Sequence, residues 1–177
     1  MLNKPLIILG SARKKSDTKK FLDLVLADID HTLIDLLDYP ISGYDYSHIY
    51  SADDSYSKIV NEVLNHNTIV FATPVYWYSM SALMKTFFDR FSDLVTYRKE
   101  IGRLLKGKST LLLAVGADLE PPQGFESPFK LTSNYLDMQF LGSIYYSTKR
   151  LGIDETYQRT IDSFRQKLID NQTGFGF

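Results

Sequence analysis

Short, mostly apolar runs alternate with amphipathic segments along this chain, and that alternation constrains the fold more than any other feature of the sequence. The runs that we interpret as strands are 6–9, 32–36, 68–72 and 110–115, with a fifth near 140–146. Continuous apolar runs of this length are typical of strands buried on both faces. Such strands occur mainly in parallel sheets that helices cover on each side.

The intervening segments have apolar residues at three- and four-residue spacing, which predicts helices. We expect these helices to follow Ser16 as far as residue 29, and to occupy 59–64, 80–95, 129–136 and 155–169. Five strand–helix units favour a doubly wound α/β sandwich, in which ligands bind beyond the carboxyl ends of the strands. That rule selects three loops, 10–18, 73–79 and 116–128, before any single residue is considered.

Length and composition narrow the function classes. The chain has 177 residues, no cysteine and a formal net charge of −1. We therefore expect a single domain over 1–177, and we exclude disulfides, catalytic thiols and a strongly basic nucleic-acid binder. No apolar run reaches the roughly 20 residues that cross a bilayer, and the first residues lack a signal-peptide layout. The expectation is a cytoplasmic protein with no membrane insertion. The three histidines show no metal-ligand spacing, so no metal site is predicted.

The first loop, 10–18, joins a predicted strand to a helix N-terminus and contains Ser11, Arg13, Ser16, Asp17 and Thr18. Backbone N–H groups, hydroxyls and the helix dipole make such a turn suited to an anion. The guanidinium of Arg13 adds a forked, charged donor for phosphate. The loop matches neither the Walker spacing nor the dinucleotide fingerprint. A helix cap followed by a solvated basic turn is the structural alternative.

The second loop has three consecutive aromatic residues, which cannot all face a core. Its residues are Thr73, Pro74, Val75, Tyr76, Trp77, Tyr78 and Ser79. The exposed rings offer a flat surface to a planar ligand, although a subunit interface is also rich in Tyr and Trp. The third loop, which starts at Gly116, is interpreted as a lid or rim.

With these motifs, nearly the whole chain resembles the flavodoxin-like NAD(P)H-dependent FMN reductases. One shared motif is Gly-Ser-x-Arg-x-x-Ser-x-Thr over 10–18; the other is Thr-Pro-x-Tyr-Trp-x-Ser over 73–79, followed by Leu-x-Lys at 83–85 and Asp-Arg at 89–90. Within the family, the chain also resembles the iron–sulfur flavoprotein subgroup, but 41–46 lacks the cysteines of that subgroup. The turn at 116–118 is also less glycine-rich than in many relatives.

The resemblance implies a three-layer α/β/α sandwich with a five-stranded parallel sheet of order 2-1-3-4-5. It also implies FMN as the cofactor and NADPH or NADH as the electron donor. The residues that it assigns to the cofactor are Ser11, Arg13, Ser16, Asp17, Thr18, Pro74, Val75, Tyr76, Trp77, Tyr78, Ser79 and Gly116. No side chain is expected to act as a catalytic acid or base, because the flavin supplies the chemistry.

The activity that follows from the resemblance is transfer of a hydride from NAD(P)H through FMN to a small acceptor such as a quinone, a nitroaromatic or free flavin. The alternatives are a flavodoxin-like electron carrier, a regulatory FMN-binding subunit, and a flavin-free α/β domain whose aromatic loop is only an interface. A homodimer is expected, because the aromatic loop and the tail residues Phe175 and Phe177 would fit a subunit contact.

Overall fold

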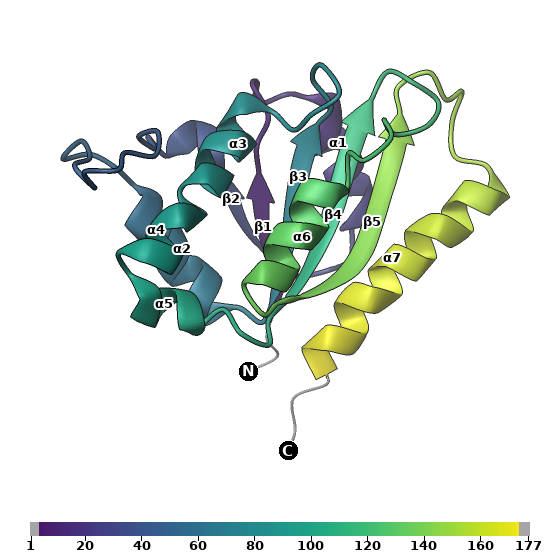
Figure 1. The fold of residues 1–177 in the computed structure, drawn as a ribbon. Helices are drawn as coiled ribbons and strands as arrows, with labels where there is room; N and C mark the ends of the chain where they lie inside the picture. Colours follow the sequence, from purple (N-terminus) through teal and green to yellow (C-terminus); the bar gives the residue numbers. More distant parts are fainter. Residues whose placement is uncertain (1–3, 174–177) are drawn as a thin grey trace.

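The computed structural model describes residues 4–173, which form one parallel five-stranded sheet with helices on both faces (Figure 1). The strands are β1 (Leu6–Leu9), β2 (Thr32–Asp35), β3 (Thr68–Pro74), β4 (Ser109–Gly116) and β5 (Gln139–Ser147). They lie in the order β2-β1-β3-β4-β5, and all four neighbouring pairs are parallel. The predicted flavodoxin-like order is therefore confirmed, and the carboxyl ends of all five strands meet at one edge.

The helices divide into two layers. They are α1 (Asp17–Val25), α2 (Tyr56–Asn65), α3 (Ala82–Asp89), α4 (Phe91–Thr96), α5 (Lys99–Arg103), α6 (Ser127–Tyr135) and α7 (Glu155–Thr173), with a 3₁₀ turn, η1 (Leu36–Asp38), after β2. Helices α1 and α7 cover the face to which Ile7 and Leu9 point. The side chains of Leu6 and Ile8 point to the other face, where α2, α3, α4 and α6 pack. No helix in the described part of the chain combines the length and the hydropathy that spanning a membrane requires.

The continuous helix expected over 80–95 is wrong: Arg90 separates α3 from α4, and α5 follows as a further short helix. The Arg90 side chain is buried, and its guanidinium donates to Asp93 and to Asp54, each at 2.8 Å. Asp54 lies in the loop after η1, so Arg90 ties that loop to the α3–α4 junction. Desolvation raises the pKa of Asp93, but hydrogen bonds from Tyr50, Arg90 and His48 outweigh it, and the net shift is downward.

Candidate functional site

A cavity of about 200 Å³ opens at the carboxyl ends of β1, β3 and β4, where the three selected loops meet. Nine of the predicted residues line it, which are Ser11, Arg13, Ser16, Asp17, Thr18, Pro74, Val75, Tyr76 and Gly116. Val115, Ala117 and Thr148 complete the lining. Trp77, Tyr78 and Ser79 do not line this cavity. They lie in the turn that follows Tyr76.

Ser11 is the most informative residue of the first loop. Its side chain is buried, with 1% of the residue exposed, and among residues 4–173 its Oγ has no hydrogen-bond partner. A buried hydroxyl without a partner costs free energy, and such groups are uncommon in folded proteins. Because Ser11 lines the cavity, a ligand oxygen placed there would provide the missing partner.

Two further hydroxyls lie at the N-terminus of α1. The Oγ of Ser16 accepts a hydrogen bond from the backbone N–H of Lys19 at 3.1 Å, so this side chain caps α1. The helix cap that the sequence offered as an alternative to an anion site is therefore present. A hydroxyl that accepts one bond can still donate another. Thr18 is also buried and lines the same wall. The positive end of the helix dipole therefore faces a cavity that contains hydroxyl donors.

The charges around this wall are largely paired. Arg13 donates to Asp17 at 3.2 Å, and Asp17 also accepts from Lys20 at 3.0 Å. The hydrogen bond from Lys20 is the largest cause that holds the pKa of Asp17 below its usual range. The ammonium group of Lys14 is bound by Asp35, the last residue of β2, and by Asp38 in η1. Arg13 is consequently the one basic residue in the cavity lining, and its exposed side chain has room to turn toward an anion.

The aromatic loop forms a tight turn that is closed by two backbone hydrogen bonds. The N–H of Tyr76 donates to the carbonyl of Ser79 at 2.9 Å, and the N–H of Ser79 donates back at 3.0 Å. The two central residues have positive φ angles, 48° for Trp77 and 66° for Tyr78. Aromatic residues rarely adopt this conformation, and strained backbone of this kind clusters at functional sites. Trp77 is 92% exposed, so its ring does not stabilise the core.

The loop that follows β4 forms the third side of the cavity. A Cβ added to Gly116 would lie 2.5 Å from the hydroxyl oxygen of Tyr145, so no larger residue fits without displacing that ring. The same hydroxyl donates to the carbonyl of Asp118 at 2.7 Å, and this bond fixes the start of the loop. The backbone N–H of Thr148 donates to the carbonyl of Gly116 at 2.8 Å. Sequence reasoning missed Thr148, although it directly follows the last strand at the same edge of the sheet.

The arrangement fits an elongated ligand that has an anionic group at one end. Sites for small molecules commonly have volumes of roughly 300–1,000 Å³, so this cavity can hold only part of such a ligand. The hydroxyls of the first loop and Arg13 suit the anionic group, and the adjacent aromatic turn suits a flat ring outside the cavity. Among residues 4–173 no cluster of three His, Cys, Asp or Glu side chains could hold a metal ion.

Comparisons with known proteins identify the family and the fold. The family model for NADPH-dependent FMN reductases matches residues 3–150. YwqN of Bacillus subtilis, described as an NAD(P)H-dependent FMN-containing oxidoreductase, is 27% identical over 82% of this chain and 86% of its own. KefF of Enterobacter sp., an ancillary protein of a glutathione-regulated potassium-efflux system, is 33% identical over 59% of this chain and 64% of its own. An NADPH-quinone reductase structure from P. pentosaceus has the same fold, with a TM-score of 0.68 and 18% identity over 93% of this chain and 97% of that one.

Proposed function

The chain belongs to the family of NADPH-dependent FMN reductases, and from this membership we propose that the cavity at β1, β3 and β4 holds the phosphate end of FMN. The observation that carries the proposal is the Ser11 hydroxyl, which is buried and finds no hydrogen-bond partner in the part of the chain that the structure describes. The hydroxyls of Ser16 and Thr18 would donate to the same phosphate, with the dipole of α1 behind them. Arg13 would turn from Asp17 to neutralise part of the phosphate charge.

The aromatic turn would hold the ring end of the cofactor. Its closing hydrogen bonds use the N–H groups of Tyr76 and Ser79. This leaves the N–H groups of Trp77 and Tyr78 for the edge of the ring, where oriented backbone donors favour a developing negative charge. Pro74 and Val75, at the end of β3, would pack against the ring. On the opposite side of the cavity, Gly116 has no side chain that would occupy the space for the cofactor.

When bound, FMN supplies the redox chemistry of the family, because it accepts a hydride from NADPH or NADH and delivers electrons to an acceptor. The chain's own residues would bind and orient the reactants, and none is proposed as an acid or base. We propose a small, planar acceptor such as a quinone, a nitroaromatic or free flavin, since the exposed rings of the turn present a flat surface beside the cavity.

The same exposed turn supports the proposal of a homodimer. Trp77 and Tyr78 are 92% and 72% exposed, and a second copy of the chain would cover them. The tail residues Phe175 and Phe177, which the sequence also suggested for this contact, lie outside the described residues. We also propose that residues 1–177 form a single domain and that the protein is cytoplasmic.

The test is the visible spectrum of the purified protein with added FMN, followed by anaerobic addition of NADPH and then NADH. We expect the flavin band to bleach with at least one nucleotide, after which acceptors can be screened by reoxidation. FMN that binds and does not bleach would instead favour an electron carrier or an ancillary subunit, as the similarity to KefF suggests. A protein that does not bind FMN would refute the proposed site.

Two loop variants test the phosphate assignment. Arg13→Ala should weaken FMN binding by about tenfold, at the low end of a charge-assisted hydrogen bond because the side chain is exposed. Lys15→Ala is the matched control, since Lys15 is in the same basic turn and does not line the cavity. Equal FMN affinity of the two variants would remove Arg13 from the site.

A further inference from the structure

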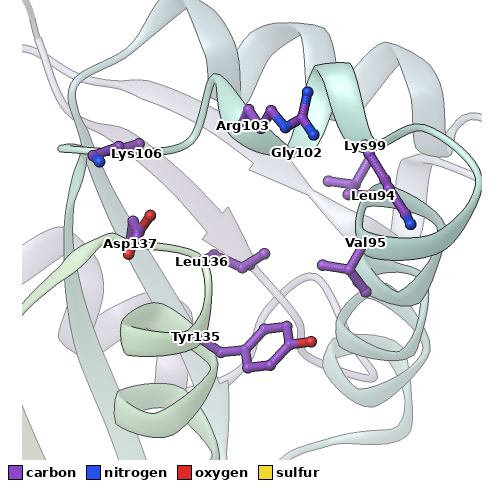
Figure 2. A pocket seen from close by; sticks show the side chains of 9 residues that line it. All are labelled: Leu94, Val95, Lys99, Gly102, Arg103, Lys106, Tyr135, Leu136 and Asp137. Atoms are coloured by element: carbon purple, nitrogen blue, oxygen red, sulfur yellow. The ribbon is translucent and has the colours of Figure 1, made fainter.

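A second cleft, of about 480 Å³, lies at the opposite edge of the sheet from the cavity described above. It opens between α4, α5 and the end of α6, next to the segments that lead into β4 and β5. Figure 2 shows Leu136 near the middle of this cleft, with Lys106 and Asp137 toward one side and Val95 and Lys99 toward the other. None of its lining residues belongs to the proposed FMN site.

The charges on this cleft are unbalanced. Elsewhere in the described part of the chain, at least ten lysine and arginine side chains form ion pairs. The three that line the cleft, Lys99, Arg103 and Lys106, form no ion pair with a carboxylate among residues 4–173. Asp137 is the one acidic residue in the lining, so the formal charge of the lining is positive.

Close packing of α5 on α4 keeps Lys99 and Arg103 over an apolar wall. A Cβ on Gly102 would lie 2.1 Å from the backbone oxygen of Leu94, so only glycine allows the two helices to approach this closely. Gly102 stands just before Arg103 in α5, and Leu94 and Val95 form the facing wall. Leu136 is buried at the base of the cleft, and the 76% exposed Tyr135 ring forms its far side.

Asp137 is unexpected where it stands. It follows the last turn of α6 with a φ of 56°, and the N–H of Met138 donates to the carbonyl of Ser133 at 2.9 Å. Glycine is the usual residue in this left-handed position, and a carboxylate at a helix C-terminus opposes the helix dipole. Asp137 therefore serves the turn poorly, and its negative charge lies on the Lys106 side of the cleft, away from Lys99 (Figure 2). An anionic group is consequently favoured on the α5 side of the cleft.

We propose that this cleft binds an organic anion with an apolar body, at a site separate from that of FMN. The anionic group would lie by Lys99 and Arg103 on α5. The apolar body would extend over Val95 and Leu136 toward the Tyr135 ring. Medium-chain carboxylates are the simplest ligands of this class, and the forked guanidinium of Arg103 suits a carboxylate. The volume is within the usual range for small-molecule sites.

The experiment is calorimetric titration of octanoate into the protein saturated with FMN. We expect one octanoate per chain, and binding about tenfold weaker in the double variant Lys99→Glu/Arg103→Glu, since two surface ion pairs together contribute roughly that factor. The control is Arg159→Glu on α7, which should bind octanoate like the natural sequence. Circular dichroism and an unchanged FMN affinity would show that each variant is folded.

Further titrations test each part of the proposal. Acetate, which has the charge without the apolar body, and octanol, which has the body without the charge, should both bind at least tenfold more weakly than octanoate. The proposal is overturned if octanoate does not bind, if the double variant binds it equally, or if octanol binds as tightly. Competition between octanoate and FMN would also overturn it, because the ligand would then occupy the flavin cavity.

Discussion

Replacing Ser11 by alanine should stabilise the protein without cofactor and weaken its binding of FMN. In the structure the Ser11 Oγ is buried and has no partner among the described residues, and an unsatisfied buried polar group costs about 1–3 kcal/mol. Alanine removes the hydroxyl and leaves nearly the same shape. We therefore expect the free energy of unfolding of the flavin-free protein to rise by about 1 kcal/mol.

The same substitution should weaken the binding of FMN. A hydrogen bond from Ser11 to a phosphate involves a charged acceptor and contributes about 1.5–3 kcal/mol. Ser11→Ala should consequently raise the dissociation constant of FMN by about 10- to 150-fold. Urea denaturation of the flavin-free protein gives the first quantity, and quenching of FMN fluorescence on titration gives the second.

Thr68 provides a matched control for both measurements. Its Oγ1 is likewise buried and without a partner among residues 4–173, but it lies at the first residue of β3, at the far edge of the sheet from the cavity. Thr68→Val should therefore stabilise the protein by a similar amount and leave FMN affinity unchanged. The reasoning is refuted if Ser11→Ala destabilises the flavin-free protein, or if both variants bind FMN like the natural sequence.

Three further outcomes follow from the described contacts. Arg90→Met leaves Asp54 and Asp93 buried without their cation. It should lower the free energy of unfolding, measured by urea denaturation, by about 3–5 kcal/mol. The control variant Lys85→Met breaks only an exposed ion pair on α3 and should lower the same free energy by about 0.5 kcal/mol. Both buried aspartates have pKa values held below the unfolded value of about 3.9, so their contribution is complete above that value and is lost as pH falls through the folded pKa. Denaturation as a function of pH should show this acid loss in the natural sequence; an equal loss in Arg90→Met would contradict its assignment to the pair. Gly116→Ala should weaken FMN binding in the fluorescence titration, because its methyl group displaces the Tyr145 ring and the loop which that ring holds; unchanged affinity would show that the loop adapts.

The sequence was sufficient for the sheet and for most of the cavity lining. Continuous apolar runs located β1, β3 and β4, because strands buried on both faces are identified by their hydrophobicity alone. The runs that located β2 and β5 are interrupted by polar residues or glycine. The rule that ligands bind beyond the carboxyl ends of parallel strands then selected the loops that meet at the cavity. Thr148 was within reach of the same rule and would have been found by extending it to the last strand.

Features that depend on distant residues were not predictable in this way. The break at Arg90 falls within an unbroken helical pattern, and the Arg90 side chain there binds Asp54, a carboxylate 36 residues away in sequence. The left-handed turn at Trp77 and Tyr78 contradicts the conformational preference of both residues. No pattern in the neighbouring sequence predicts this turn, so it can be recognised only once the backbone conformation is known.

The order of the strands also determines how the chain is assembled during synthesis. β1 pairs on one edge with β2 and on the other with β3, which begins at residue 68, about 60 residues after β1 ends at residue 9. At a synthesis rate of roughly 5–20 residues per second, β3 is made about 3–12 s after β1. During that time the edge of β1 that will pair with β3 has no partner strand. β5 is the last strand made and closes the far side of the sheet. A nascent chain that stalls before residue 139 therefore exposes the buried strand β4 as an open edge, the kind of surface that chaperones bind and that seeds aggregation.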